Sequence, residues 1–369
     1  MSLPIDILTR LAGFPSVVGT PNDAIMGYVA DYLRGHGIEP MLIAGPEGDR
    51  WNLFATIGDA AHAGYILSGH VDVVPAGEPG WLADPFVLRR EGDRLIARGA
   101  CDMKGFVAAV LAMVPELAAM PLSAPVHIAL SYDEEAGCRG VPHLLAAMPG
   151  LCAPPLGAII GEPSGLVPVL AHKGKAALRL VASGVAGHSS RPDLGANAIH
   201  ALLPALDAAA AQAMALQSGP QDARFAPPWS SLQIGTIAGG QAVNIIPDRA
   251  EAQIEARAIH GVDPRAILDP VIAAAAGPLS VEWLSSYPAL ALAGDHPLAR
   301  LIAELTGAAP LGAVSYGTEA GLYQQAGIPA IICGPGDIAR AHRPEEYLTE
   351  AELTACCGMI RRLGQSLCA

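Results

Sequence analysis

Several residues that can bind divalent metal ions follow directly after apolar stretches of the sequence. His70 and Asp72 come at the end of AGYILSG, Glu134 and Glu135 come shortly after PVHIAL, and Glu162 comes after LGAIIG. A buried histidine is stable only when its ring nitrogens have partners, and an unpaired carboxylate beside a buried strand is costly. Alone, a His-x-Asp pair is usually a satisfied core histidine and a Glu-Glu pair is usually solvated, so their chemistry depends on what they meet.

Two further residues complete a possible ligand set. Asp102 lies in RGACDMKGF, a Gly-flanked turn that opens a predicted helix, and His342 lies in ARAHRPEEY. Alone, an acid at a helix start is usually a cap or a partner of the helix dipole. Several carboxylates that converge with two histidines, however, are costly without a cation. Two histidines and three carboxylates suit two divalent metals, most simply zinc.

The elements that must position these residues alternate between strands and helices. Apolar runs predict strands at 52–58, 63–72, 125–135 and 156–163, and helical periodicity predicts helices at 25–37 and 104–120. This alternation is typical of a mostly parallel sheet covered by helices, with functional loops at the carboxyl ends of the strands. We therefore expect an α/β/α domain that brings the candidate ligands to one edge of its sheet.

The middle of the chain has a different pattern. Residues 249–259, RAEAQIEARAI, alternate polar and apolar with period two, which predicts a strand with one wet and one buried face. Together with its neighbours, this stretch gives the order β-α-β-β-α-β of a small split βαβ sandwich, from strands at 176–183 and 231–239 and helices at 197–216 and 263–277. We expect a catalytic domain made of 1–174 and 288–369, interrupted by an inserted lid or dimerisation domain at 175–287.

The composition excludes several classes of protein. A length of 369 residues favours two domains, and 51% hydrophobic with 15% charged residues argues against disorder. The net charge of −13 argues against nucleic acid or an anionic membrane as a partner. No stretch has the density of large apolar residues expected of a membrane span, and the N-terminus lacks the features of a signal peptide. Seven cysteines without a CxxC motif indicate a reduced, cytoplasmic protein.

Six stretches together resemble one family. SGHVDVVP, GACDMKGF, DEEAGC, GEPSG, GHSSRPDLGANAI and AHRPEEY are similar, in this order, to motifs of the dinuclear zinc deacylases and peptidases typified by acetylornithine deacetylase, succinyl-diaminopimelate desuccinylase and aminoacylase. The resemblance covers essentially the whole chain. It implies that Asp102 bridges two zinc ions, with Co²⁺ as a possible substitute, and that the remaining ligands are divided between them: His70 and Glu162 for one, Glu135 and His342 for the other.

The resemblance also implies the roles around the metals. Glu134 matches the general base, which takes a proton from water and later passes it to the leaving amine. Asp72 matches the carboxylate that fixes the imidazole of His70. His188 matches a histidine that stabilises the tetrahedral oxyanion, often in the active site of a partner subunit, so we expect a homodimer formed through the inserted domain.

Other matches concern the substrate. Arg257 matches an arginine that binds the substrate α-carboxylate, a task that suits a guanidinium group, although a solvated sheet face is the ordinary interpretation of this position. Asn244 matches a residue that contacts substrate, and Gly317 and Thr318 lie in a loop that can supply backbone donors. Glu319 is interpreted as an acid in the first turn of a helix rather than as a partner of a basic substrate side chain.

The expected reaction is hydrolysis of the amide of a small N-acyl amino acid. The stretch SYGTEAGLYQQAGIPAIICGPG resembles acetylornithine deacetylases most, which favours N2-acetyl-L-ornithine as substrate and a place in arginine biosynthesis. Succinyl-diaminopimelate desuccinylase, general aminoacylase and metallocarboxypeptidase activity of the same family are the alternatives. A metal-binding dimer without activity is the alternative from another class, and an intact Glu134 argues against it.

Overall fold

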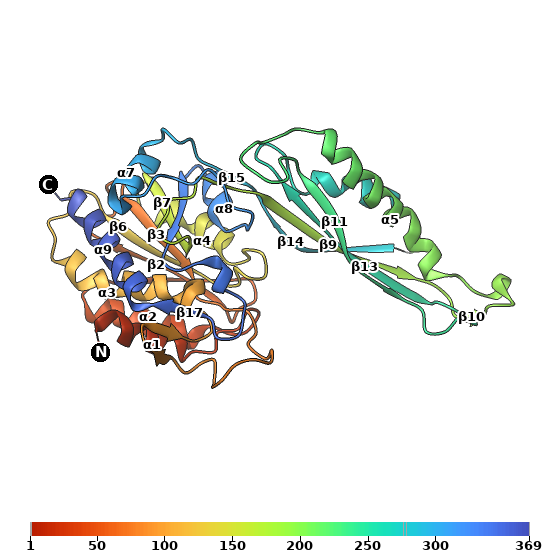
Figure 1. Cartoon of the computed structure of the whole chain (residues 1–369), viewed down its shortest axis with the longest axis horizontal. Helices are drawn as coiled ribbons and strands as arrows, with labels where there is room; N and C mark the ends of the chain where they lie inside the picture. The colour runs from red at the N-terminus through yellow and green to blue at the C-terminus, as the bar shows by residue number, and fades with distance from the viewer. Residues whose placement is uncertain (1, 276, 278, 369) are drawn as a thin grey trace. The chain divides into compact units, whose positions relative to one another are not determined.

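The chain forms two compact units in a computed structural model that describes residues 2–275, 277 and 279–368 (Figure 1). The first unit comprises Met1–Ala171, Leu292–Gly312 and Thr318–Ala369, and the second comprises His172–Ala291 and Ala313–Gly317. The domain boundaries expected at 175 and 287 stay a prediction.

The first unit is built on a six-stranded sheet with the order β1-β2-β6-β3-β7-β16. Its strands, in chain order, are β1 Met41–Ala44, β2 Trp51–Ile57, β3 Tyr65–His70, β6 Val126–Ser131, β7 Gly157–Pro163 and β16 Ala330–Gly334. The pairs β3–β6, β3–β7 and β7–β16 are parallel, whereas β1–β2 and β2–β6 are antiparallel. Burial of β6, β7 and β16 along their whole length explains why these strands are continuous apolar runs in the sequence.

The helices of this unit pack in two groups. In the first, α3 lies against β2, β3 and β7 and packs with α1 and α9; in the second, α4 and α8 pack together, α4 against β1, β2 and β6 and α8 against β7 and β16. The bounds are α1 Leu3–Ala12, α2 Asp23–Gly35, α3 Gly105–Ala118, α4 Val141–Ala147, α7 Pro297–Thr306, α8 Ala320–Gln325 and α9 Glu350–Ser366. Helix α3 is buried almost all round, which suits its apolar sequence. A small second sheet, β17-β5-β4, consists of Tyr347–Thr349, Arg94–Ile96 and Arg89–Glu91.

The second unit is a four-stranded antiparallel sheet with the order β11-β13-β9-β14. Its elements follow the predicted order β-α-β-β-α-β: β9 Gly174–Ser183, α5 Ala198–Ala215, β11 Ser231–Gly239, β13 Arg249–Ala258, α6 Asp269–Ala274 and β14 Leu279–Tyr287. The predicted alternation is confirmed in β13, where every second residue from Ala250 to Ala258 is buried in a core shared with α5 and α6. A single helix was predicted over 263–277; the structure instead has a 3₁₀ turn at Ala266–Leu268 followed by α6, and Ala276 lies outside the described residues.

Helix α5 bears on the expectation that no stretch has the apolar density of a membrane span. Among the described residues, the stretch Ala198–Ser218 is long and apolar enough to cross a membrane by length and composition alone. In the structure this alanine-rich helix is capped by Asn197, whose side chain accepts hydrogen bonds from the backbone of Ile199 and His200. The helix packs on the sheet through Leu202, Ala205 and Ala209.

Candidate metal centre

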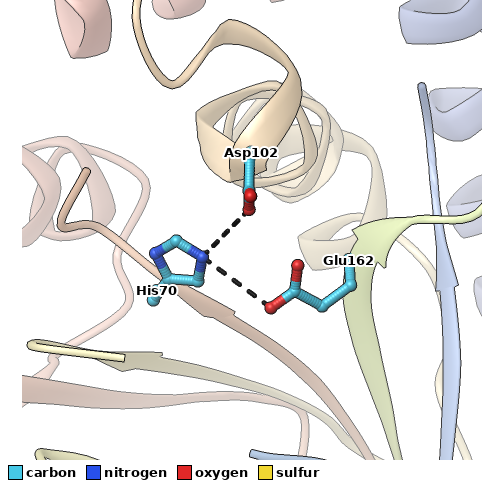
Figure 2. A group of neighbouring side chains, drawn as sticks. All are labelled: His70, Asp102 and Glu162. Atoms are coloured by element: carbon cyan, nitrogen blue, oxygen red, sulfur yellow. Dashed lines mark hydrogen bonds and ion pairs between the residues drawn. The ribbon is translucent and has the colours of Figure 1, made fainter. Parts of the chain in front are cut away.

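His70 is the last residue of β3 and is fully buried. Its Nδ1 lies 2.9 Å from the backbone oxygen of Asp72, and since a carbonyl oxygen only accepts, Nδ1 carries the proton. The other nitrogen, Nε2, faces two carboxylates, Asp102 Oδ1 at 3.2 Å and Glu162 Oε1 at 3.8 Å (Figure 2). With Nδ1 held as the donor, loss of the Nε2 proton leaves the tautomer that a histidine needs in order to bind a metal through Nε2.

Asp102 lies between two clusters of possible ligands. While its Oδ1 faces His70, its Oδ2 lies 3.2 Å from His342 Nε2, which is also 2.8 Å from Glu135 Oε1. The groups His70–Asp102–Glu162 and Asp102–Glu135–His342 each bring their ligand atoms within 4.8 Å of one another. Imidazole nitrogen and carboxylate oxygen in two such groups fit a pair of divalent metals that share one carboxylate.

The parallel strands explain why these residues meet. His70 is aligned with Ser131 at the end of β6, and β7 runs parallel on the other side of β3, so the carboxyl ends of all three strands share one edge of the sheet. The loop after β6 is fixed by Asp72, whose two carboxylate oxygens accept hydrogen bonds from the backbone nitrogens of Glu134 and Glu135 at 3.1 Å each. The Asp72 carboxylate also lies 3.5 Å from Nδ1 of His70, farther than the Asp72 carbonyl oxygen.

The electrostatics of the first group show how much negative charge the site collects. Burial alone would raise the pKa of Asp102, but hydrogen bonds from His342 and His70 outweigh burial and hold that pKa below its usual value. Burial raises the pKa of Glu162 well above its usual value, and the charge of Asp102 adds to this effect. Burial would lower the pKa of His70, yet its interactions with Asp102 and Asp72 raise that pKa well above the usual value.

The second group shows the same competition. Hydrogen bonds to Asp102 and Glu135 raise the pKa of His342 to about 10. Burial and the Asp102 charge raise the pKa of Glu135. Protonated histidines thus partly neutralise the carboxylates, which is the task that bound cations perform better.

Glu134 is buried beside these groups. Burial raises the pKa of its carboxyl group to about 8. The thiol of Cys138 lies 3.3 Å from Glu134 Oε1 and donates a weak hydrogen bond to it. A carboxyl group with a pKa near neutrality, next to a cluster of possible metal ligands, has the properties of a general acid–base.

Comparison with known proteins decides the family. The model of peptidase family M20/M25/M40 matches residues 66–366. The chain belongs to this family. It is therefore a metal-dependent hydrolase, as the sequence predicted.

Full-length relatives agree with this assignment to M20. The chain is 31% identical to an acetylornithine deacetylase of Yersinia pseudotuberculosis, over 100% of this chain and 99% of the relative. The fold is that of an M20 metallo-carboxypeptidase from Sulfolobus solfataricus, with a TM-score of 0.81, 18% identity and 99% of each chain covered. A dinuclear metal-binding M20 peptidase from Bacillus subtilis has a TM-score of 0.65, with 17% identity over 99% of this chain and 97% of that one.

The remaining residues singled out in this M20 sequence are divided between the units. His188, Asn244, Arg257 and Gly317 belong to the second unit, whereas Thr318 belongs to the first. His188 is exposed in the short strand β10, Gly187–His188, with its Nδ1 2.7 Å from Ser190 Oγ. Asn244 is exposed, and its backbone oxygen accepts a hydrogen bond from Ser189 N at 3.0 Å.

Arg257 is not a simply solvated arginine. Its Nε donates to Glu255 Oε1 at 2.7 Å and its Nη1 donates to Tyr287 Oη at 3.4 Å. A Cβ atom at Gly317 would lie 2.5 Å from the ring of Tyr287, so a larger residue at this position would displace that ring. Thr318 is buried, and its hydroxyl accepts a hydrogen bond from Ala320 N at the start of α8.

Sequence reasoning missed the part played by Glu319. Its side chain is buried against the sheet, and its carboxylate accepts hydrogen bonds from Ser68 Oγ at 2.6 Å and Ser131 Oγ at 2.7 Å. These serines belong to β3 and β6, the strands that lead to His70 and Glu134. Glu319 does stand at the start of α8, as predicted, but its carboxylate makes no cap hydrogen bond and holds the two strands instead. The two serines in SGH and LSYDEE were the signal, but nothing in the sequence joins them to residue 319.

Proposed function

We propose that this M20 chain hydrolyses the amide bond of an N-acyl amino acid, with N2-acetyl-L-ornithine as the leading substrate. The proposal depends on one observation: the two carboxylate oxygens of Asp102 face two different ligand groups, beside the buried Glu134. The full-length similarity to acetylornithine deacetylases supports the choice of acyl group and amino acid. Desuccinylation, general aminoacylase activity and carboxypeptidase activity are the alternatives within the family.

We assign the metal ligands accordingly. Asp102 would be the ligand shared by the two ions, His70 and Glu162 would hold one, and Glu135 and His342 would hold the other. Zinc is the expected metal because it accepts both imidazole nitrogen and carboxylate oxygen, and Co²⁺ is a possible substitute. When bound, the metal pair supplies Lewis-acid chemistry toward the amide carbonyl and a water molecule.

The chain's own residues handle the proton. Glu134 takes the proton of the attacking water and passes it to the leaving nitrogen, a role that suits a carboxyl group whose pKa lies near 8. Asp72 keeps Glu134 in place through the backbone of residues 134 and 135, and it orients His70.

The second unit is proposed to bind substrate and a partner subunit. Arg257 takes the α-carboxylate of the substrate, for which it must exchange or share its contact with Glu255. Asn244, Gly317 and Thr318 are assigned to substrate binding, and His188 to stabilising the oxyanion. The proposed assembly is a cytoplasmic homodimer formed through the inserted domain, acting on a small-molecule substrate in arginine biosynthesis.

A hydrolysis panel with zinc added tests the substrate. N2-acetyl-L-ornithine, N-succinyl-diaminopimelate and N-acetyl-methionine distinguish the three amidohydrolase activities, and a dipeptide series tests the carboxypeptidase activity. The highest kcat/KM is expected for acetylornithine. Preference for another member of the panel would move the assignment within the family, and no hydrolysis by a zinc-loaded chain would favour the inactive metal-binding dimer.

A subunit-mixing experiment tests His188. His188→Ala is expected to lower kcat by about 10²–10³, the usual size for one lost oxyanion donor, and to leave metal content intact. If His188 acts in the partner's site, mixing inactive Glu134→Ala and His188→Ala subunits restores about a quarter of the activity, because random exchange makes half of the dimers heterodimers with one intact site. No recovery despite proven exchange would place His188 in its own chain's site or outside catalysis.

A further inference from the structure

Arg98 and Glu346 form a buried ion pair close to the metal centre. Each has an exposed fraction of only 1%, and Arg98 Nη1 lies 2.9 Å from Glu346 Oε2. The two residues are 248 positions apart in the sequence, so the pair joins distant segments of the first unit. Two charges removed from water are stable only when geometry and further hydrogen bonds compensate, so the other contacts of the pair show what it holds.

The second oxygen of Glu346 holds the segment that carries Asp102. Glu346 Oε1 accepts hydrogen bonds from the backbone nitrogens of Cys101 at 2.9 Å and of Asp102 at 3.0 Å. Asp102 itself is extended, with φ −121° and ψ 94°, within the turn Ala100–Lys104. Glu346 therefore fixes the backbone of the carboxylate that faces both ligand groups.

Arg98 reaches two more segments. Its Nη1 donates to the backbone oxygen of Arg343, next to His342, and its Nη2 donates to that of Pro75, each at 3.3 Å. Nη2 also pairs with Glu78, and the guanidinium lies over the ring of Trp81, 5.1 Å from its centroid. The pair thus connects the segment after His70 and Asp72, the turn of Asp102 and the segment of His342.

The segment of His342 needs such support. His342 has φ 58° and Glu345 has φ 60°, left-handed values that are unfavourable for residues other than glycine. Residues in this conformation are strained and persist only where the surroundings fix them. His70 and Glu162, by contrast, belong to strands whose backbone is fixed by the sheet.

We propose that the Arg98–Glu346 pair is a positioning clasp for the metal group Asp102–Glu135–His342. The clasp keeps His342 in its left-handed conformation and holds Asp102 toward it, so that the affinity of this group for its ion depends on the pair. The group His70–Asp102–Glu162 shares Asp102 with it, but its other two ligands lie on strands that the sheet holds, so this group depends on the clasp much less. This inference rests on the proposed two-metal function. It adds two residues, Arg98 and Glu346, that are not themselves metal ligands.

A merely structural ion pair makes a different prediction. Breaking a buried pair by removing one partner strongly destabilises the folded protein, wherever the pair lies. A structural role would therefore lower the melting temperature and weaken both metal-binding steps alike. A clasp weakens one step and spares the other, and the two metal affinities separate these outcomes.

The experiment titrates full-length, metal-free protein with Zn²⁺ and follows stoichiometry, the Kd of each step and thermal unfolding. Glu346→Gln keeps an oxygen for the backbone donors of Cys101 and Asp102 but loses the charge that pairs with Arg98. Arg98→Met and the double variant complete the cycle. The matched control is Arg340→Met, which removes another arginine–carboxylate pair, with Glu352 at 2.8 Å, from the segment that precedes His342.

In Glu346→Gln the first zinc is expected to bind as in the unchanged protein and the second about 10–100-fold more weakly, the usual loss when an outer partner of a metal ligand is removed. The double variant is expected to bind the second zinc no more weakly than Arg98→Met, because both changes break one interaction. Arg340→Met is expected to lower thermal stability and leave both affinities unchanged.

Two results would overturn the clasp while the two-metal assignment stands: an unchanged second Kd in Glu346→Gln, or equal weakening of both steps. If Arg98→Met fails to fold, Glu346→Gln still decides, because it keeps the acceptor oxygen and side-chain volume. Fewer than two zinc ions bound by the unchanged protein at saturation would overturn the two-metal assignment itself and the clasp with it.

Discussion

The two ligand groups of the metal centre are built by different means. His70 and Glu162 lie on the neighbouring parallel strands β3 and β7, and their side chains are almost completely buried. Glu135 and His342 lie in loops, and the side chain of His342 has an exposed fraction of 48%. Sheet hydrogen bonds position the first group, whereas contacts between distant loops position the second.

This difference teaches where the centre is preformed. A strand keeps its backbone whether or not a metal is bound, because its hydrogen bonds are made to other strands. A left-handed loop residue such as His342 keeps its conformation only while its partners hold it. We call His70–Asp102–Glu162 the strand-end group and Asp102–Glu135–His342 the loop group. We therefore expect the strand-end group to bind its ion first and the loop group to bind its ion second.

The largest effect is expected from Glu134→Gln, which tests whether either group depends on the proton-transfer residue. The variant keeps the shape of the side chain but cannot accept the proton of water. Loss of general acid–base catalysis lowers kcat by about 10²–10⁴, and more if one residue serves both proton transfers. Metal analysis is expected to find both ions in place. Retention of most of kcat would remove Glu134 from the role of base.

Removing one histidine from each group tests the comparison directly. His342→Ala leaves the strand-end group, and His70→Ala leaves the loop group. We expect the ion that remains in His342→Ala to bind about tenfold more tightly than the one in His70→Ala, because one strained loop residue costs on the order of 1.4 kcal/mol. Isothermal titration with Zn²⁺ measures both constants. Equal affinities would mean that the loop group is as preformed as the strands.

Removal of metal sharpens the comparison residue by residue. Binding to the folded state alone stabilises it by roughly 2.7 kcal/mol at a free metal concentration of 100 times Kd. A chelator is expected to increase amide hydrogen exchange in 338–346 more than in β3 and β7, since the latter are held by the sheet. Uniform loss of protection in all three segments would contradict the distinction.

The last prediction concerns the sheet that supports the strand-end group. His127 is buried in β6, 2.9 Å from Thr56 Oγ1 and stacked on Phe54, and burial lowers its pKa to about 4. Because the unfolded chain binds the proton near pH 6.5, stability is complete above that pH and falls as the pH drops toward 4. At pH 5 the loss is about 2 kcal/mol.

Denaturant unfolding at pH 7 and pH 5 measures this loss of stability. The control is His127→Gln, which lacks the imidazole of residue 127 but keeps all the other titrating groups of the chain. The unchanged protein is expected to lose more stability than the variant over this interval. Equal losses would show that protonation of His127 does not destabilise the sheet, and that acid lowers the stability through other groups.

The sequence predicts the strand-end half of the centre better than the loop half. Buried parallel strands are continuous apolar runs, so the residues that follow them, such as His70 and Glu162, stand out. Asp102 and His342 were found through their motifs and the family resemblance. The Arg98–Glu346 pair and Glu319 escaped, because a buried charge looks like a surface charge in sequence and its partners are about 250 positions away.

The secondary structure shows the same limit on a smaller scale. The alternation at 249–259 identifies β13 because each buried position is apolar, and packing under α5 and α6 agrees with it. The helix predicted at 263–277 is shorter in the structure, ending at Ala274, although alanine favours helix. In a run of alanines the buried and exposed positions have the same side chain, so the sequence does not show where the packed helix ends.

The place where the chain leaves the first unit has a consequence for folding. The chain leaves after Ala171 and returns at Leu292, and within the first unit Leu292 N donates to Leu170 O at 2.8 Å. Strands β7 and β16, which pair across this excursion, therefore close a long loop, but closure entropy grows only by about 0.6 kcal/mol for each doubling of loop length. Once residues 172–291 have folded, Ala171 and Leu292 are held close together, so the effective loop between β7 and β16 is much shorter than their separation in sequence. A chain in which residues 172–291 are replaced by a few glycines should still close the sheet of the first unit.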